Sequence, residues 1–323
     1  MARPVTRRVL VTGGAGFIGS HVAERFLEDG WSVEILDNLS SGRRDNLPSA
    51  ARFHEGDIGS PEARAIVRDG RFDVVCHLAA QIDVRRSVAD PMNDARINVL
   101  GTLNLVEGMR AAGRPTRFVA SSTGGAIYGD FVEPPCSEDA AKEPEAPYGV
   151  SKLSSEYYLA SQARLHGIDV VALRYSNVYG PRQDPHGEAG VVAIFCGRLL
   201  EGRALTVYGD GKQTRDYVFV GDVARANLSA ATCSLPAVGG VDARAFNIGT
   251  ARETSVLELG SVLGEVAGST ASIEHAPARP GELQRSAVRI AKAAKWLGWK
   301  PMTDLREGLS RTYEWFAHRH ATR

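Results

Sequence analysis

The chain has 323 residues, of which 43% are hydrophobic and 24% charged, and its 38 Lys and Arg residues balance its 38 Asp and Glu residues. This balance excludes the strong positive field that draws proteins to nucleic acid or to anionic membranes, and the apolar runs are too short to cross a bilayer. Since the N-terminus carries no segment resembling a signal peptide, we expect a cytoplasmic enzyme of one large or two modest domains, with no nucleic-acid or membrane partner.

A strand, a glycine turn and a helix open the chain, over residues 9–30. Three glycines, Gly13, Gly16 and Gly19, are spaced three apart; such glycines allow a tight turn, close approach of a pyrophosphate, and close packing of helix on strand. The N–H groups at the start of the helix suit a phosphate anion, and Gly30 can end the helix. This stretch predicts a dinucleotide-binding site.

The second strand, residues 32–36, ends in Asp37, which lies eighteen residues past Gly19. A carboxylate at this position can accept hydrogen bonds from both hydroxyls of an adenosine ribose, and its charge repels a 2′-phosphate. Arg43 and Arg44 in the following loop could hold a 2′-phosphate, which leaves NADP as an alternative. We predict that the cofactor is NAD.

Strands and helices continue to alternate up to residue 175. We expect strands at 51–55, 72–78, 117–122 and 169–175, and helices at 61–68, 94–112 and 148–166. This alternation predicts an α/β fold with a Rossmann-type, doubly wound parallel sheet. We expect His77 to be a hydrogen-bonded core residue. Cys76 and Cys196 are expected to be buried thiols, and the four cysteines show neither paired nor metal-ligand spacing, so we expect no metal.

The regular alternation weakens after Ser176. We expect a helix at 191–200, a strand pair that turns at Asp210 and Gly211 as a tight hairpin, a last sheet strand at 246–249, and a helical tail. This predicts an NAD-binding domain of residues 1–175 plus 220–250. A smaller, mixed α/β lobe would comprise residues 176–219 plus 251–323.

Tyr148 and Lys152 are four residues apart at the start of a predicted helix, so their side chains project from one face. A tyrosine with a pKa near 10 is a poor base at neutral pH, but a neighbouring ammonium favours the phenolate. Ser122 and Thr123 stand at the end of an intervening strand, at the edge where open α/β sheets bind ligands. These residues together indicate a site for proton transfer beside a nicotinamide.

The combined motifs resemble those of the extended short-chain dehydrogenase/reductase superfamily, and within it the nucleotide-sugar 4-epimerases of the UDP-glucose 4-epimerase type. The resemblance covers nearly the whole chain, and its marks are residues 12–19, 37–39, 56–58, 78–80, 121–123, Tyr148 with Lys152, 174–180, 215–217 and 279–282. It implies an NAD-dependent isomerase of carbohydrate metabolism that inverts C4 of a UDP-sugar through a 4-keto intermediate. The smaller lobe would then bind the nucleotide-sugar.

The resemblance also implies residue roles. Tyr148 would take the proton of the sugar 4-hydroxyl, Thr123 would hydrogen-bond the same oxygen, and Lys152 would hold the nicotinamide ribose and lower the tyrosine pKa. The remaining residues expected to bind NAD are Gly13, Gly16, Phe17, Ile18, Asp37, Asn38, Asp57, Ile58, Leu78, Ala79, Ala80, Asn98, Ser121 and Tyr175.

The substrate is expected to be held from the smaller lobe. Arg215 and Arg279 are candidates for the diphosphate, because guanidinium forks match phosphate oxygens. The resemblance places Asn177, Val192 and Tyr208 along the nucleotide-sugar site, with Tyr208 near the uracil. Two further residues expected to contact the substrate are Gln213 and Glu282.

UDP-glucose and UDP-galactose are the expected pair, and two features leave other sugars open. Ser286 lies where this family walls off the substituent at sugar C2, and a serine leaves room for the N-acetyl group of UDP-N-acetylglucosamine. Arg85 and Arg182 lie in predicted loops near the sugar, where either could pair with the carboxylate of UDP-glucuronate.

Other functions on the same scaffold fit less well. Related 4,6-dehydratases carry Asp-Glu after the threonine, where this chain has Gly124 and Gly125. A decarboxylase would also be expected to carry an acidic residue near this position, and this chain has none there. A non-catalytic NAD-binding sensor would be expected to lose the tyrosine and lysine. We also expect a homodimer, because the helices at 94–112 and 148–166 carry more apolar surface than one face requires.

Overall fold

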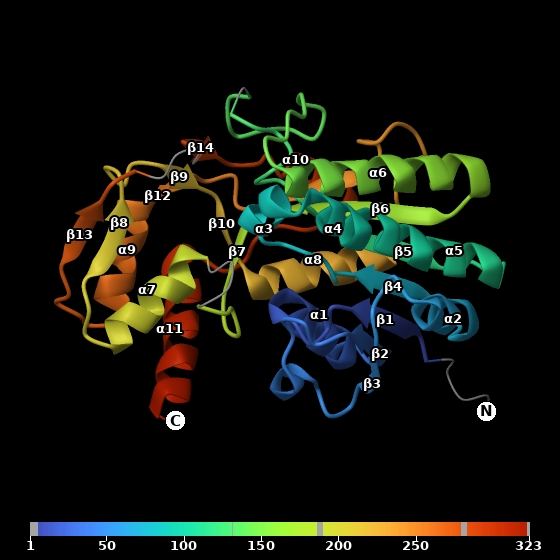
Figure 1. Cartoon of the computed structure of the whole chain (residues 1–323), viewed down its shortest axis with the longest axis horizontal. Coiled ribbons are helices and arrows are strands. Elements are labelled where there is room, and N and C mark those ends of the chain that lie inside the picture. Colours follow the sequence, from blue (N-terminus) through green and yellow to red (C-terminus); the bar gives the residue numbers. More distant parts are fainter. Residues whose placement is uncertain (1–5, 131, 186–189, 279–282, 322–323) are drawn as a thin grey trace.

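The computed structural model describes residues 6–130, 132–185, 190–278 and 283–321. Figure 1 shows a large body that contains the central sheet and a smaller body made of β8, β13, α7, α9 and α11. The strands are β1 Arg8–Thr12, β2 Ser32–Asp37, β3 Arg52–Glu55, β4 Val74–His77, β5 Arg117–Thr123, β6 Asp169–Tyr175, β7 Asn177–Tyr179, β8 Leu205–Tyr208, β9 Thr214–Arg215, β10 Tyr217–Phe219, β11 Ala245–Ile248, β12 Thr254–Ser255, β13 Ile273–Ala276 and β14 Arg285–Ser286.

The α-helices are α1 Phe17–Glu28, α2 Pro61–Asp69, α3 Val84–Ala89, α4 Pro91–Ala95, α5 Thr102–Ala112, α6 Pro147–His166, α7 Val191–Leu200, α8 Val220–Thr232, α9 Val256–Val266, α10 Ala291–Leu297 and α11 Leu305–Ala321. A short 3₁₀ turn, η1, spans Arg44–Asn46, and a π-helical turn, η2, spans Arg96–Gly101. Among the described residues, no helix is both long enough and apolar enough to cross a membrane.

Seven strands form one parallel sheet in the order β11-β6-β5-β4-β1-β2-β3. The strand order reverses between β1 and β4, and ligands of open α/β sheets bind at such a switch point, beyond the carboxyl ends of the strands. The predicted Rossmann-type, doubly wound α/β sheet is therefore confirmed.

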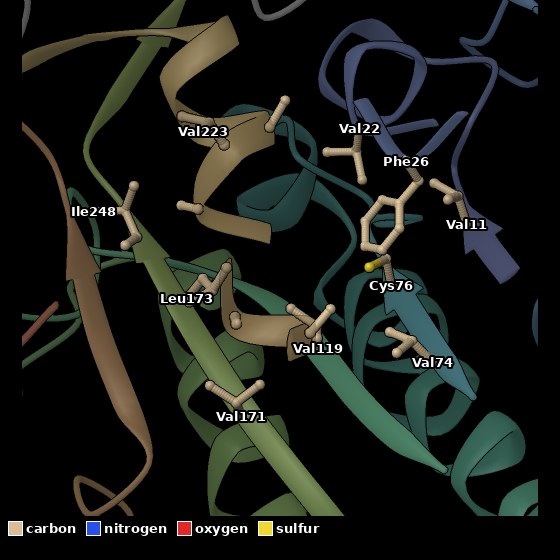
Figure 2. Close-up of a cluster of buried hydrophobic side chains, with 14 of the residues drawn as sticks. Val11, Val22, Phe26, Val74, Cys76, Val119, Val171, Leu173, Val223 and Ile248 are labelled. Atoms are coloured by element: carbon tan, nitrogen blue, oxygen red, sulfur yellow. The ribbon is translucent and has the colours of Figure 1, made fainter. Parts of the chain in front are cut away.

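Helices cover both faces of this sheet because its strands are apolar on both sides. On one face, α1 and α8 pack with β1, β4, β5, β6 and β11. Figure 2 shows Val22 and Phe26 of α1 on the side of Val11 and Cys76, and Val223 of α8 on the side of Leu173 and Ile248. On the other face, α2, α5 and α6 contribute Val67, Leu105 and Leu159.

A second apolar core joins β8 and β10 with α7, α9 and α11 through Phe195, Val207, Leu259 and Phe316. Phe17 and Ile18 of α1 pack against it. Ile18 also packs against the core on the α1 side of the large sheet, so the start of α1 contacts the cores of both bodies. By contrast, Trp299 after α10 is buried in the core on the α1 side of the large sheet. The predicted domain boundaries remain a prediction.

The predicted hairpin at Asp210 and Gly211 is wrong. β8 pairs in parallel with β13, and β9 pairs with β12 and β14, so the two strands around the turn do not pair with each other. Asp210 instead accepts a hydrogen bond from the backbone N–H of Lys212 at 3.0 Å, which redirects the chain. Local turn chemistry predicted a turn correctly, but more distant segments supplied the partner strands.

The helix predicted at 94–112 begins earlier and is not uniform. It starts at Pro91, where Asp90 caps the first turn by accepting from the backbone N–H of Asn93. The π-helical turn η2 then separates α4 from α5. A π-helical turn inserts an extra residue into a helix and is frequent at functional sites.

Candidate functional site

The glycine turn after β1 forms a backbone cradle. Gly13 has a φ of +70°, and a Cβ on it would lie 2.6 Å from the backbone nitrogen of Ala79 at the end of β4. A Cβ on Gly19 would lie 2.1 Å from the carbonyl oxygen of Gly13, so only glycine lets α1 approach the turn this closely. With Gly16 at its N-cap, α1 begins without a capping side chain, at Phe17 and Ile18. These features fit a dinucleotide pyrophosphate.

Asp37 is the last residue of β2 and is 7% exposed. One carboxylate oxygen accepts from the backbone N–H of Ala15 at 3.0 Å and the other from that of Leu39 at 2.8 Å. Burial raises the pKa of this carboxyl, and the two N–H donors oppose the rise. The arginines that could favour NADP have acidic partners: Arg43 pairs with Asp45, and Arg44 pairs with Glu55.

The residues predicted at the adenosine end meet where β2 and β3 end. Asn38 donates from its side-chain nitrogen to one oxygen of Asp57 at 3.1 Å, and the other oxygen accepts from the backbone N–H of Gly59 at 2.8 Å. The side chain of Ile58 is buried in the core between the sheet and α2. The segment after β3 therefore lies beside the Asp37 loop, and the backbone N–H of Gly56 donates to the carbonyl oxygen of Asp37 at 3.0 Å.

Beyond β4, the predicted residues Leu78, Ala79 and Ala80 lie partly buried beside the glycine turn. The backbone N–H groups of Leu78 and Ala79 bond to the carbonyl and hydroxyl oxygens of Thr12, at 3.1 and 3.3 Å. The structure confirms that His77 is a hydrogen-bonded core residue, because its ring nitrogens lie 2.8 and 2.9 Å from the hydroxyls of Thr12 and Thr102. Burial lowers the pKa of His77 to about 3, so the ring is neutral.

Asn98 lies in the π-helical turn η2 and is 2% exposed. Its side chain accepts from the backbone N–H of Gln81 at 2.9 Å and donates to Ser151 Oγ at 3.1 Å. Its own carbonyl oxygen accepts from Ser155 Oγ at 2.9 Å. Since Ser151 and Ser155 flank Lys152 on α6, η2 is fastened to that helix around the lysine.

Three predicted catalytic residues come from β5 and α6. Thr123 ends β5 and is 8% exposed, while Tyr148 lies in the first turn of α6 and Lys152 in the second. A Cβ on Gly149 would lie 2.5 Å from the carbonyl oxygen of Ala126, so the chain leaving β5 packs directly on the start of α6. Burial lowers the pKa of Lys152 to about 8, so the ammonium loses its proton more readily than an exposed lysine.

Two predicted cofactor residues lie on the neighbouring strand ends. Ser121 of β5 is half-buried, and Tyr175 ends β6 with 6% exposure. The hydroxyl of Tyr175 is paired with the side chain of Asn227 on α8, whose nitrogen donates to it at 2.8 Å. This contact fixes the tyrosine ring between the sheet and α8.

The predicted substrate residues are spread over several small strands. Asn177 begins β7 and is exposed, and Gln213 donates from its side chain to the carbonyl oxygen of Tyr208 at 3.0 Å. Arg215 of β9 lies opposite Ser286 of β14 in the strand pairing. Ser286, which is predicted to lie near sugar C2, and Arg215, which is predicted to bind the diphosphate, are therefore neighbours. Arg279 and Glu282 lie outside the described residues.

Three further residues predicted to contact the substrate lie on helices or in a turn rather than on the small strands. Arg85 is exposed on helix α3, so the predicted loop is wrong; Asp83 caps that helix by accepting from the backbone N–H of Arg86 at 2.9 Å. Arg182 lies in a turn as predicted, where it donates to Glu24 and lies 3.3 Å from His21, both on α1. Val192 is 1% exposed and packs in the second core.

A buried ionic cluster on β5, α6 and β6 was not predicted from the sequence. Arg174 of β6 is paired with Glu156 of α6, and Ser122 donates to the same carboxylate. The sequence signal is an arginine directly after the apolar residues 170–173 of a parallel strand, because a charge in that position needs a buried partner.

Known proteins resemble this chain over nearly its full length. The model of the NAD dependent epimerase/dehydratase family matches residues 9–249. A UDP-glucose 4-epimerase of Mycolicibacterium smegmatis is 45% identical over 317 residues, which cover 97% of this chain and 99% of that protein.

Two solved structures are also similar. A UDP-glucose 4-epimerase of Thermotoga maritima, crystallised with UDP-glucose, has a TM-score of 0.91 and 45% identity, covering 98% of this chain and 100% of that one. The UDP-glucose 4-epimerase of Thermus thermophilus in complex with NAD has a TM-score of 0.88 and 43% identity, covering 96% of this chain and 98% of that one.

Proposed function

Because this chain belongs to the NAD dependent epimerase/dehydratase family, we propose that it is an isomerase that inverts C4 of a UDP-hexose, with UDP-glucose and UDP-galactose as the pair. The observation that carries the proposal is that the chain leaving Thr123 at the end of β5 packs through Ala126 on the start of α6, where Tyr148 and Lys152 lie one turn apart.

The cofactor site is proposed to hold NAD through backbone and carboxylate contacts. The cradle at Gly13, Gly16 and Gly19 fits the pyrophosphate, and Asp37 accepts from the adenosine ribose hydroxyls. NAD bound there would supply the acceptor for the hydride of C4 and the donor that returns it to the other face.

The chain's own residues transfer the proton of the sugar 4-hydroxyl. Tyr148 takes the proton of the 4-hydroxyl and gives it back after the sugar has turned over, which is general base and then general acid catalysis. The ammonium of Lys152 favours the phenolate, because an opposite charge nearby lowers the pKa of a phenol. Thr123 hydrogen-bonds the same sugar oxygen and orients it.

The nucleotide end of the substrate is proposed to lie along the small strands. Arg215 binds the diphosphate, and Arg279 is proposed to join it. Ser286, beside Arg215, is small and leaves room at sugar C2, which supports UDP-N-acetylglucosamine as a second substrate. Gly124 and Gly125 after Thr123 bring no acid or base for eliminating water, which argues against dehydration.

We also propose a cytoplasmic homodimer. Large apolar side chains are exposed on neighbouring parts of η2 and α6, with exposed fractions of 60% for Leu100, 49% for Val150 and 55% for Tyr157. Such a patch on a protein surface marks an interaction site. The four cysteines are free thiols, which suits a reducing compartment.

The replacement Tyr148→Phe tests the proposed chemistry. It removes the hydroxyl that transfers the proton, so turnover of UDP-glucose should fall about 10²–10⁴-fold while bound NAD is retained. The matched control is Tyr158→Phe on the exposed side of the same helix, which should retain full turnover. Near-normal turnover of Tyr148→Phe would remove this residue from the mechanism.

A further inference from the structure

Glu156 and Arg174 form an ion pair inside the large body. The guanidinium of Arg174 donates to Glu156 Oε2 from Nη2 at 2.6 Å, and Nε lies 3.1 Å from both carboxylate oxygens. The side chains are 2% and 0% exposed, respectively. Arg174 is thus one of the largest fully buried side chains of the described chain.

The pair has a complete set of polar partners. Ser122 Oγ donates to Glu156 Oε1, while Arg174 also donates to Asp242 at 2.7 Å and to the hydroxyl of Tyr128 at 3.1 Å. Replacing a buried ion pair by apolar residues is often neutral or stabilising, so such a pair is weak evidence for a role in stability alone. Its position in the fold therefore needs another explanation.

The pair joins the three elements that carry the proposed active site. Glu156 lies one helical turn beyond Lys152 on α6, and i,i+4 residues share a helix face. Ser122 directly precedes Thr123 on β5, and Arg174 directly precedes Tyr175 on β6. One carboxylate thereby links α6 to the ends of both strands.

We propose that Glu156 is a positioning residue for the epimerase reaction: held by Arg174 and Ser122, it fixes α6 on the strand ends and supplies the negative charge that Lys152 needs to remain an ammonium. This inference rests on the proposed function, since it assigns a purpose to the charge of Lys152. Glu156 itself touches neither substrate nor cofactor in this proposal.

The charges around Lys152 agree with this role. Burial is the main cause that lowers the pKa of Lys152, and Glu156 followed by Asp94 of α4 opposes it. The facing ring of His77 on β4 is neutral, and Tyr148 lies one turn earlier on α6. The other charged side chains of the helices packed on α6 are exposed or partly exposed: Arg85, Arg86, Arg96, Glu107 and Arg110.

Glu156→Gln tests the proposal, because it keeps the shape of the side chain and removes its charge. Arg174 would then keep the carboxylate of Asp242 but lose that of Glu156, so Lys152 should lose its proton at lower pH. In the pH profile of kcat for UDP-glucose, the fall of activity on the alkaline side (the alkaline limb) should therefore shift to lower pH by about one unit, with KM changed less than twofold. A lower kcat at every pH with an unmoved alkaline limb would show a merely structural role and overturn the proposal.

Glu156→Asp is the conservative comparison, since it retains the charge and shortens the side chain. It should restore the alkaline limb of the wild type at a reduced kcat. Because Glu156→Asp keeps the negative charge, a limb moved to lower pH in this variant would contradict the proposal, also where Glu156→Gln yields no folded or no active protein.

Glu34→Gln is the matched control. Glu34 is 5% exposed and is paired with Arg8 and His54 on the far part of the sheet, so its replacement should lower thermal stability without moving the pH profile. A limb moved equally by Glu34→Gln would also contradict the proposal. Failure of the proposed function itself would show differently, as full turnover by Tyr148→Phe or as a wild-type protein without epimerase activity.

Discussion

The carboxylate of Asp37 accepts a hydrogen bond from the backbone N–H of Ala15 at 3.0 Å and so joins the end of β2 to the glycine turn. The loop after β2 closes over the same group, since a Cβ on Gly42 would lie 2.8 Å from Asp37 Oδ1. A carboxylate held in this way is positioned for ribose hydroxyls and unfavourable for a 2′-phosphate. Cofactor choice should therefore depend on this residue.

Asp37→Ser should weaken NAD binding about 10–100-fold, because a hydrogen bond to a charged group contributes about 1.5–3 kcal/mol. It should also admit NADP, since the repelling charge is gone. The measurement is chromatography of the cofactor released on denaturation, followed by titration with both cofactors. Glu201→Gln, at an exposed residue after α7, is the control and should leave the preference for NAD intact. Recovery of mostly NADP from the wild-type protein would contradict this assignment.

His77 should make the protein less stable in acid. The pKa of an unfolded histidine is near 6.5, whereas burial lowers the pKa of folded His77 to about 3. The unfolded chain therefore binds a proton first, and stability that is present above pH 6.5 is lost as the pH falls toward 3, by about 2 kcal/mol at pH 5.

His77→Gln removes this titration while an amide can still bond to Thr12 and Thr102. The loss in free energy of unfolding between pH 7 and pH 5, measured by urea denaturation, should be smaller in this variant by about 2 kcal/mol. His320→Gln on the exposed end of α11 should behave as the wild type. An equal loss in His77→Gln and the wild type would show that His77 does not contribute.

The proposed dimer predicts a change of mass on replacing one exposed residue. Leu100→Asp places a charge in the apolar patch of η2 and α6, so it should convert a dimer into a 34.7 kDa monomer at micromolar concentration. Met302→Asp, at a residue with 77% exposure elsewhere, should stay dimeric. Sedimentation velocity separates the two states. A wild-type chain that sediments as a monomer would exclude the proposed interface.

Much of the fold was predictable because local patterns and long-range packing agree. The glycine turn, the strand ending at Asp37 and the helix ending at His166 each carry their own signal. Gly167, with a φ of +65°, ends that helix as a left-handed glycine does. The partners of β8 and β9 were not predictable in this way, since a turn at Gly211 does not specify which distant segment pairs with a strand.

The candidate site could be predicted where residues carry a recognisable type and spacing. Tyr148, Lys152 and Thr123 belong to recognisable motifs, and the fold brings their elements together. The π-helical turn around Asn98 leaves no mark in the hydrophobic pattern, since it depends on hydrogen bonds to Ser151 and Ser155 of another helix. The position of Arg182 beside Glu24 likewise depends on tertiary packing.

The most direct test of the central claim is epimerisation followed by proton NMR, with UDP-glucose, UDP-N-acetylglucosamine and UDP-glucuronate assayed side by side without added NAD. Enzyme that retains its cofactor should convert UDP-glucose to an equilibrium mixture with UDP-galactose. The open C2 wall at Ser286 predicts that UDP-N-acetylglucosamine is turned over as well. Turnover of UDP-glucose alone would remove the role of Ser286, whereas efficient turnover of UDP-glucuronate alone, or inversion of none of the three sugars, would contradict the account.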